Sequence, residues 1–211
     1  SKMRYAKKEL KIGGISTSET EVKDIIKAWT AISLAFAIAM RGSSLFSTDF
    51  YFKFVISAMT VGMGFLLHEL GHKIVAQRYG CFAEFRAFDN MLVLAIAMSF
   101  FRVIFAAPGA VMISGRVNSR KNGIISAAGP VVNLVLASFF IFLYFIPLPS
   151  LLKSISFYGF VINLWLALFN MIPFWFFDGY KIFKWSKIAY SLIVGVAIAF
   201  MLAQNFIPLK I

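Results

Sequence analysis

Apolar residues in this chain gather into six long stretches, separated by shorter segments that hold most of the charges. A helix needs about 20 apolar residues to cross a membrane. The stretches cover residues 28–46, 51–79 and 90–107, and parts of 123–152, 154–177 and 188–209. The last three stretches are long enough to cross. The second is long enough if its polar motif is counted, and the first is marginal. This pattern predicts an all-α polytopic membrane protein with five to six transmembrane helices.

The third stretch, residues 90–107, is too short to span, because Arg102 follows after only 12 uncharged residues. We expect it to re-enter the membrane or to lie in the interface. If it does not cross, 17 of the 21 Lys and Arg residues fall on one side of the membrane. Loops rich in Lys and Arg usually face the cytoplasm. This arrangement therefore predicts five spans and a cytoplasmic N-terminus. If the stretch crossed, the charge bias would largely vanish.

Composition supports a membrane location. The chain is 60% hydrophobic, with a mean hydropathy of +0.82 and 25 Phe, whereas soluble domains are about 45–50% apolar. We therefore expect a multi-pass integral protein of the cell membrane, with residues 1–27 as a cytoplasmic tail and 28–209 as a single transmembrane domain. The net charge of +12 does not indicate nucleic-acid binding, because no basic run alternates with aromatic residues.

Two local signals mark helix ends. Residues 18–21 (Ser-Glu-Thr-Glu) form a capping-box pattern, which predicts a helix start ahead of the first stretch. Pro173 is expected to end or kink the fifth helix, and Gly179 permits a tight backbone just after it.

The chain has only two histidines, and both lie in the sequence His68-Glu69-Leu70-Gly71-His72. On a helix, residues four apart share one face, so both imidazoles can reach one metal ion. A carboxylate between them can act on a water bound to that metal. Ionisable groups inside a membrane are energetically unfavourable and usually functional. The motif therefore predicts a catalytic zinc site with Glu69 as its general base.

A catalytic zinc takes three protein ligands, and the third must come from elsewhere. Glu84 and Asp89 follow the motif closely, Cys81 is expected near the surface, and Asp178 follows the fifth helix. In the five-span topology, the second and fifth helices run in the same direction. Asp178 then reaches the same cytoplasmic half of the membrane as the histidines, which makes it the preferred ligand.

The order of motifs resembles the site-2 protease family of intramembrane zinc metalloproteases. The resemblance rests on HELGH at 68–72, on Ala-Gly-Pro-Val-Val-Asn at 128–133, on Pro-Gly-Ala-Val at 108–111, and on N-x-x-P-x-x-x-x-D-G at 170–179. The resemblance covers about residues 60–187. The chain resembles the short archaeal or bacterial form of the family, which has no accessory soluble domains. We take 51–187 as the catalytic core.

The resemblance implies one Zn²⁺ per chain, held by His68, His72 and Asp178, with Glu69 as the base. It implies that Asn170 helps to hold the substrate or the oxyanion, and that residues 108–111 form an edge strand near the site. The implied substrates are transmembrane helices of other proteins, cut within or near the membrane. An extended run at 108–114 can bind an unwound substrate by strand addition, although an ordinary interfacial loop is an equal alternative.

Other polar residues carry less weight. Asn163 is interpreted mainly as a hydrogen bond between helices, although it shares a helix face with Asn170 and can line a water cavity. For Asn133, a hydrogen bond between helices is an equal alternative. Arg102 is expected to reach the membrane surface.

Two rival functions are compatible with the His68–His72 motif: a membrane zinc carrier, and an inactive scaffold that binds transmembrane helices.

Overall fold

The computed structural model describes residues 9–12, 14–40, 47–103 and 108–206. Most of this chain is helical, and two short antiparallel sheets accompany the helices. In chain order the elements are β1 (Glu9–Ile12), β2 (Ile15–Ser18), α1 (Glu19–Ala39), α2 (Thr48–Ser57), a π-helical segment (Ala58–Gly62), α3 (Met63–Arg78), β3 (Phe82–Ala87), α4 (Asp89–Ser99), β4 (Gly109–Ser114), α5 (Ser119–Phe145), α6 (Ser150–Asn170), α7 (Asp178–Trp185), α8 (Lys187–Ala203) and a 3₁₀ turn (Gln204–Phe206).

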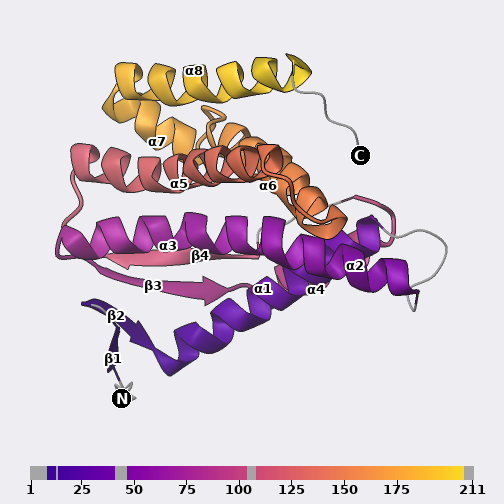
Figure 1. The fold of residues 1–211 in the computed structure, drawn as a ribbon. Helices are drawn as coiled ribbons and strands as arrows, with labels where there is room; N and C mark the ends of the chain where they lie inside the picture. The colour runs from indigo at the N-terminus through magenta and orange to yellow at the C-terminus, as the bar shows by residue number, and fades with distance from the viewer. Residues whose placement is uncertain (1–8, 13, 41–46, 104–107, 207–211) are drawn as a thin grey trace.

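Helix α3 lies between two layers (Figure 1). On one side it contacts α5, which in turn contacts α6 and α7. On the other side it contacts the two-stranded sheet of β3 and β4. Helix α1 runs along the sheet side and contacts α2, α4 and β3. Residues of α3 therefore face both the helical bundle and the sheet.

Helix α1 begins where the capping pattern predicts. Ser18 is its N-cap, and the Ser18 hydroxyl accepts a hydrogen bond from the Glu21 backbone N–H at 3.1 Å. The Glu21 side chain reaches away from the cap, to Lys73 and to the backbone of Phe85. Residues 9–12 and 15–18, expected as part of a tail, pair as the antiparallel strands β1 and β2. The all-α prediction is wrong for this segment.

Helix α2, the π-helical segment at 58–62 and helix α3 follow one another without a break and form one helical stretch over residues 48–78. A π-helical turn shifts the helical hydrogen bonds by one residue, and such turns are frequent near functional sites. Here the Trp29 indole N–H donates to the Ala58 carbonyl at 3.1 Å. Gly62 permits this approach, since a Cβ at Gly62 would lie 2.8 Å from the Trp29 ring. The histidine motif follows on α3.

The predicted edge strand is present as β4, and it pairs with β3 in antiparallel register from Phe82↔Ser114 to Ala87↔Gly109. Strand β3 was not predicted. Between the strands, helix α4 occupies the first part of the 90–107 segment, and Arg102 follows it with a φ of 61°. The Phe88 N–H donates to the Pro108 carbonyl at 3.0 Å, so the segment leaves the sheet and returns at one point. Its position relative to a membrane stays a prediction.

Three helices of the described chain are long and apolar enough to cross a membrane: Thr48–Arg78, Ser119–Phe145 and Ser150–Asn170. Two further apolar helices, α4 and α8, are shorter. Helix α1 has 21 residues, but its first half carries charges. Three helices could therefore span a membrane by length and composition, and the number of five to six spans stays a prediction.

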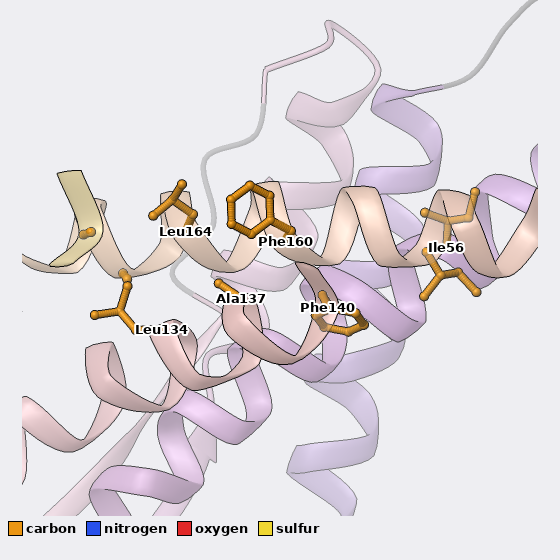
Figure 2. Packing of buried hydrophobic residues seen from close by; sticks show 9 residues of the cluster. Ile56, Leu134, Ala137, Phe140, Phe160 and Leu164 are labelled. Carbon is orange, nitrogen blue, oxygen red and sulfur yellow. The ribbon is translucent and has the colours of Figure 1, made fainter. Parts of the chain in front are cut away.

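The largest hydrophobic cluster lies where α5, α6 and α2 meet (Figure 2). Phe140 of α5 packs over Gly159 of α6, where a Cβ would lie 2.5 Å from the Phe140 ring. Small residues allow helix backbones to approach closely in membrane proteins. The tight contact fixes α6, and with it the chain that leads to Asp178.

Candidate metal centre

His68 and His72 lie one turn apart on the face of α3 that contacts α5. Only 4% of His68 and 8% of His72 is exposed. Gly71, between them, lets the helices approach closely, since a Cβ there would lie 3.2 Å from the Ala128 carbonyl of α5. The helical spacing and the apolar surroundings thus place both imidazoles inside the protein.

Asp178 reaches the two histidines from the start of α7. Helix α6 ends at Asn170, ahead of Pro173 as predicted, and a turn leads to α7. A Cβ at Gly179 would lie 2.3 Å from the Met171 carbonyl, so the glycine allows α7 to begin against the end of α6. The Oδ2 atom of Asp178 lies 3.3 Å from His68 Nε2 and 3.0 Å from His72 Nε2.

Burial acts to raise the pKa of the Asp178 carboxyl, but the adjacent imidazoles of His72 and His68 lower it below its usual range. The carboxyl is therefore ionised and able to act as a ligand. Its other oxygen, Oδ1, lies 3.7 Å from Lys181 Nζ.

The partners of the two Nδ1 atoms fix the imidazole tautomers. His72 Nδ1 lies 2.7 Å from the Ile125 carbonyl, which can only accept a hydrogen bond. His68 Nδ1 lies 2.6 Å from Asn133 Oδ1. The Asn133 amide group donates to the Gly64 carbonyl and to Asn163 Oδ1, so Asn133 Oδ1 is the acceptor. Both Nδ1 atoms thus carry protons, and both Nε2 lone pairs are available to a metal.

Gly129 of α5 keeps the space between the Nε2 atoms open. A Cβ at this position would lie 2.4 Å from His68 Nε2 and 2.5 Å from His72 Nε2. The side chains of His68, His72 and Asp178 offer three ligand atoms within 4.8 Å of one another, facing this space. The backbone of α5 therefore leaves room for an ion beside the three ligands.

Glu69 extends from α3 toward the sheet. Its Oε2 accepts a hydrogen bond from the Val111 N–H of β4 at 3.0 Å. Glu69 is partly exposed, whereas both histidines are buried. The carboxylate thus connects the histidine helix to the strand predicted near the site.

The other candidate ligands have partners elsewhere. Glu84 bonds to Ser18 and pairs with Arg86, Asp89 pairs with Lys27, and Cys81 is buried in the cluster of Ala76, Ala83 and Ile125. The Asn170 amide donates to the Leu166 carbonyl of its own helix at 2.9 Å. Its role toward substrate stays a prediction.

Comparison with known proteins agrees with this geometry. The chain is 43% identical over 156 residues to a Methanocaldococcus jannaschii protein named "Putative zinc metalloprotease". The aligned region covers 72% of this chain and 82% of the relative. This chain belongs to the zinc metalloprotease family. No protein-family model and no solved structure matches it.

The three side chains fit the metal of this family. Zinc binds imidazole nitrogen and carboxylate oxygen at about 2.0–2.2 Å in a tetrahedral site, which separates neighbouring ligand atoms by about 3.3–3.5 Å. The Asp178 oxygen lies 3.0 and 3.3 Å from the two Nε2 atoms. Two imidazoles and one carboxylate also leave a fourth position open, as catalytic zinc sites do.

Asn133 has a contact at the site that the sequence interpretation, in which a hydrogen bond between helices was one alternative, did not include. The structure does give it such bonds, to Gly64 and Asn163, but its Oδ1 holds His68. A signal was available, because Gly129 and Asn133 are four apart and so share one face of their helix.

Replacing Asn133 by Leu is expected to weaken zinc affinity by about 10–100-fold, the usual effect of losing a group that orients a metal-bound histidine. The zinc affinity of each variant is measured by the release of zinc to a competing chelator. Ser138→Ala is the matched control, because the Ser138 hydroxyl bonds within its own helix, to Leu134. Equal zinc affinity in Asn133→Leu and the parent would refute the role of Asn133.

Proposed function

We propose that this protein is a site-2-type intramembrane zinc metalloprotease, which hydrolyses peptide bonds within or near transmembrane helices of other membrane proteins. One observation carries the proposal. The HExxH residues lie on a helical stretch, Thr48–Arg78, that is long and apolar enough to cross a membrane. His68 is 20 residues from its start, or about 30 Å along the helix.

Bound at His68, His72 and Asp178, zinc would polarise the scissile carbonyl and lower the pKa of a water. Glu69 then accepts a proton from that water and passes it to the leaving amine. Glu69 follows His68 by one position, or about 100° around the helix, so its carboxylate does not join the histidines as a ligand but lies on the sheet side of the site, where it can reach a water at the open position. The bond from Val111 N–H holds the carboxylate in this direction.

Strand β4 is the proposed binding edge for the substrate. A helical substrate must unwind before its peptide bond can be attacked, and its exposed backbone groups then need partners in a lipid environment. In the register of β3 and β4, Val111 lies opposite Phe85, and the N–H groups of both residues bond outside the sheet. The Val111 bond marks the outward edge of β4, and the other backbone groups along this edge are the proposed partners for strand addition.

The proposed membrane arrangement has a cytoplasmic N-terminus and a 90–107 segment that does not cross. The proposal extends to a single transmembrane domain over 28–209, to lipid contacts along its apolar helices, and to Asn170 as a substrate or oxyanion contact. Its support is the charge distribution and the hydrogen bond between Phe88 and Pro108, which brings these two residues together beside the sheet.

Cysteines placed at Phe82 and Asn118 in a Cys81→Ser background are expected to react from the same side of the membrane. Both positions are exposed, and they flank the paired ends of β3 and β4. A membrane-impermeant maleimide applied to sealed vesicles of known orientation measures this. Reaction from opposite sides would refute the five-span arrangement.

The experiment that tests the function uses purified, zinc-loaded protein in liposomes with a panel of single-span helical substrates. Cleavage is expected to stop when a chelator removes zinc and to return when zinc is added back. A zinc carrier or a helix-binding scaffold would bind zinc or helices without cleaving any substrate, so zinc-loaded protein that leaves the whole panel intact would refute the proposal.

A further inference from the structure

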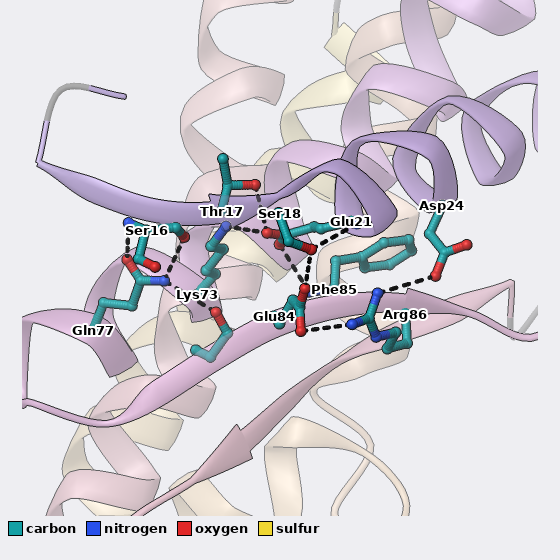
Figure 3. A network of polar contacts seen from close by, with 11 residues as sticks. Ser16, Thr17, Ser18, Glu21, Asp24, Lys73, Gln77, Glu84, Phe85 and Arg86 are labelled. Atoms are coloured by element: carbon teal, nitrogen blue, oxygen red, sulfur yellow. Dashed lines mark hydrogen bonds and ion pairs between the residues drawn. The ribbon is translucent and has the colours of Figure 1, made fainter. Parts of the chain in front are cut away.

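A buried polar network joins α1, α3 and the outer edge of β3 (Figure 3). At its centre, Lys73 and Glu21 form an ion pair, with Nζ and Oε2 2.6 Å apart. Lys73 is 1% exposed and Glu21 is fully buried. Lys73 directly follows the metal-site residue His72, but it points into this network, outside the site described above.

Glu21 makes three contacts with different parts of the chain. Its Oε2 accepts from Lys73 Nζ and, at 2.6 Å, from the Thr17 hydroxyl. Its Oε1 accepts from the backbone N–H of Phe85 at 2.8 Å. One carboxylate thus connects the helix of the metal site to the outer edge of strand β3.

The Phe85 contact matters because of the sheet register. Phe85 lies directly opposite Val111, the residue whose N–H donates to Glu69. At this pair of positions, the two outward N–H groups are each held by a glutamate: Glu21 on the β3 side and Glu69 on the β4 side. The two-stranded sheet is therefore fixed between two carboxylates at the point nearest the proposed base.

Neighbouring contacts hold the same sheet from further along. The Gln77 amide group donates to the Ala83 carbonyl and to the Ser16 carbonyl, and its oxygen accepts from the Ser16 N–H. Glu84 bonds to Ser18 and to Arg86. Beside the direct bond between Glu69 and Val111, Glu21 and Lys73 give α3 a second link to the Phe85–Val111 position.

We propose that Glu21 and Lys73 are positioning residues, which set the place of strand β4 relative to Glu69. The inference rests on the proposed function, in which the β4 edge binds the unwound substrate. Replacing a buried ion pair by apolar residues of similar size is often neutral for stability, so stability alone does not require this pair. The fixed geometry of its hydrogen bonds gives it the positioning role.

Two double variants separate positioning from charge. Glu21→Gln with Lys73→Met removes both charges but keeps an oxygen that can accept from Phe85 N–H. Glu21→Leu with Lys73→Met removes both charges and the acceptor. The pair Asp49–Lys53, bonded at 2.6 Å on the exposed start of α2, gives the matched control Asp49→Asn with Lys53→Met.

The first readout is hydrogen exchange of residues 109–114 in the zinc-loaded protein. We expect exchange there to rise about tenfold in the Leu/Met variant, the equivalent of one hydrogen bond to a charged group, and to stay near the parent in the Gln/Met variant and in the control. Equal exchange in the Leu/Met and Gln/Met variants would overturn the proposal, whatever the activity of the protein.

The second readout separates KM from kcat for a cleaved substrate. A displaced β4 edge raises KM about tenfold in the Leu/Met variant, whereas a merely smaller folded fraction lowers the apparent kcat and leaves KM unchanged. A fall in kcat alone would therefore contradict positioning. If the parent cleaves nothing, the proposed function fails, and hydrogen exchange still decides the positioning role.

Glu21→Asp is the alternative test variant if the Leu/Met variant does not fold. It keeps the charge and shortens the side chain by one C–C bond, about 1.5 Å, so one carboxylate no longer reaches both Lys73 and Phe85. The expected result is faster exchange at 109–114 and a raised KM with zinc content unchanged. Parent-like values for both would overturn the proposal.

Discussion

Glu69→Gln is expected to retain zinc and to lose about 10²–10⁴-fold in turnover, the range for removal of a general base. The substitution preserves size, and the Gln oxygen can still accept from the Val111 N–H, so β4 stays in place. The side chain no longer accepts a proton from water. Turnover of a transmembrane-helix substrate and zinc content are measured on the same samples.

Glu19→Gln is the matched control for Glu69→Gln. Glu19 is exposed in the first turn of α1, so the same chemical change there leaves turnover unaltered. The comparison also separates a protease from a zinc carrier, whose function needs the ligands but no base. If Glu69→Gln turns over substrate as fast as the parent, the proposed role of Glu69 is wrong.

Gly129→Ala is expected to abolish the metal site. The new methyl group would lie within 2.5 Å of both Nε2 atoms, in the space where the ion binds. Zinc affinity is expected to fall by more than about 100-fold, the upper end for loss of a supporting residue, with cleavage lost in parallel. Zinc titration of the purified variant measures the first effect directly.

A destabilised helix cannot account for that result, since Ala favours a helix interior over Gly by about 1 kcal/mol. Gly195→Ala in α8 is the control, because a Cβ there meets no atom within 4 Å. It is expected to retain zinc and activity. Stoichiometric zinc bound to Gly129→Ala with parent affinity would place the ion elsewhere.

The sequence predicted the parts of the site that depend on local rules. Two histidines four apart share a helix face whatever surrounds them, and Pro173 ended α6 because a proline cannot continue a helix. The link from this helix to Asp178, 106 residues further on, came from counting charges and from the family resemblance. The structure brings the three side chains together.

The sequence did not predict features that depend on contacts between distant segments. Strand β3 is a six-residue strand that pairs with β4 across an inserted helix, and its own pattern carries no clear alternation. Glu21 was interpreted as half of a capping box, but tertiary contacts with Lys73 and Phe85 determine its position. Asn133 does make the contacts between helices that were one predicted alternative, but its bond to His68 was not predicted, because the two residues are 65 positions apart.

Mass spectrometry of the cleavage products tests most directly whether this zinc metalloprotease cuts inside membranes. Single-span substrates in liposomes are incubated with zinc-loaded protein in ¹⁸O-labelled water. The account predicts new termini within or next to the apolar segment of the substrate, with one ¹⁸O in each new carboxyl group and no cleavage by Glu69→Gln. Cuts confined to soluble flanking sequences, or cleavage that persists in Glu69→Gln, would contradict it.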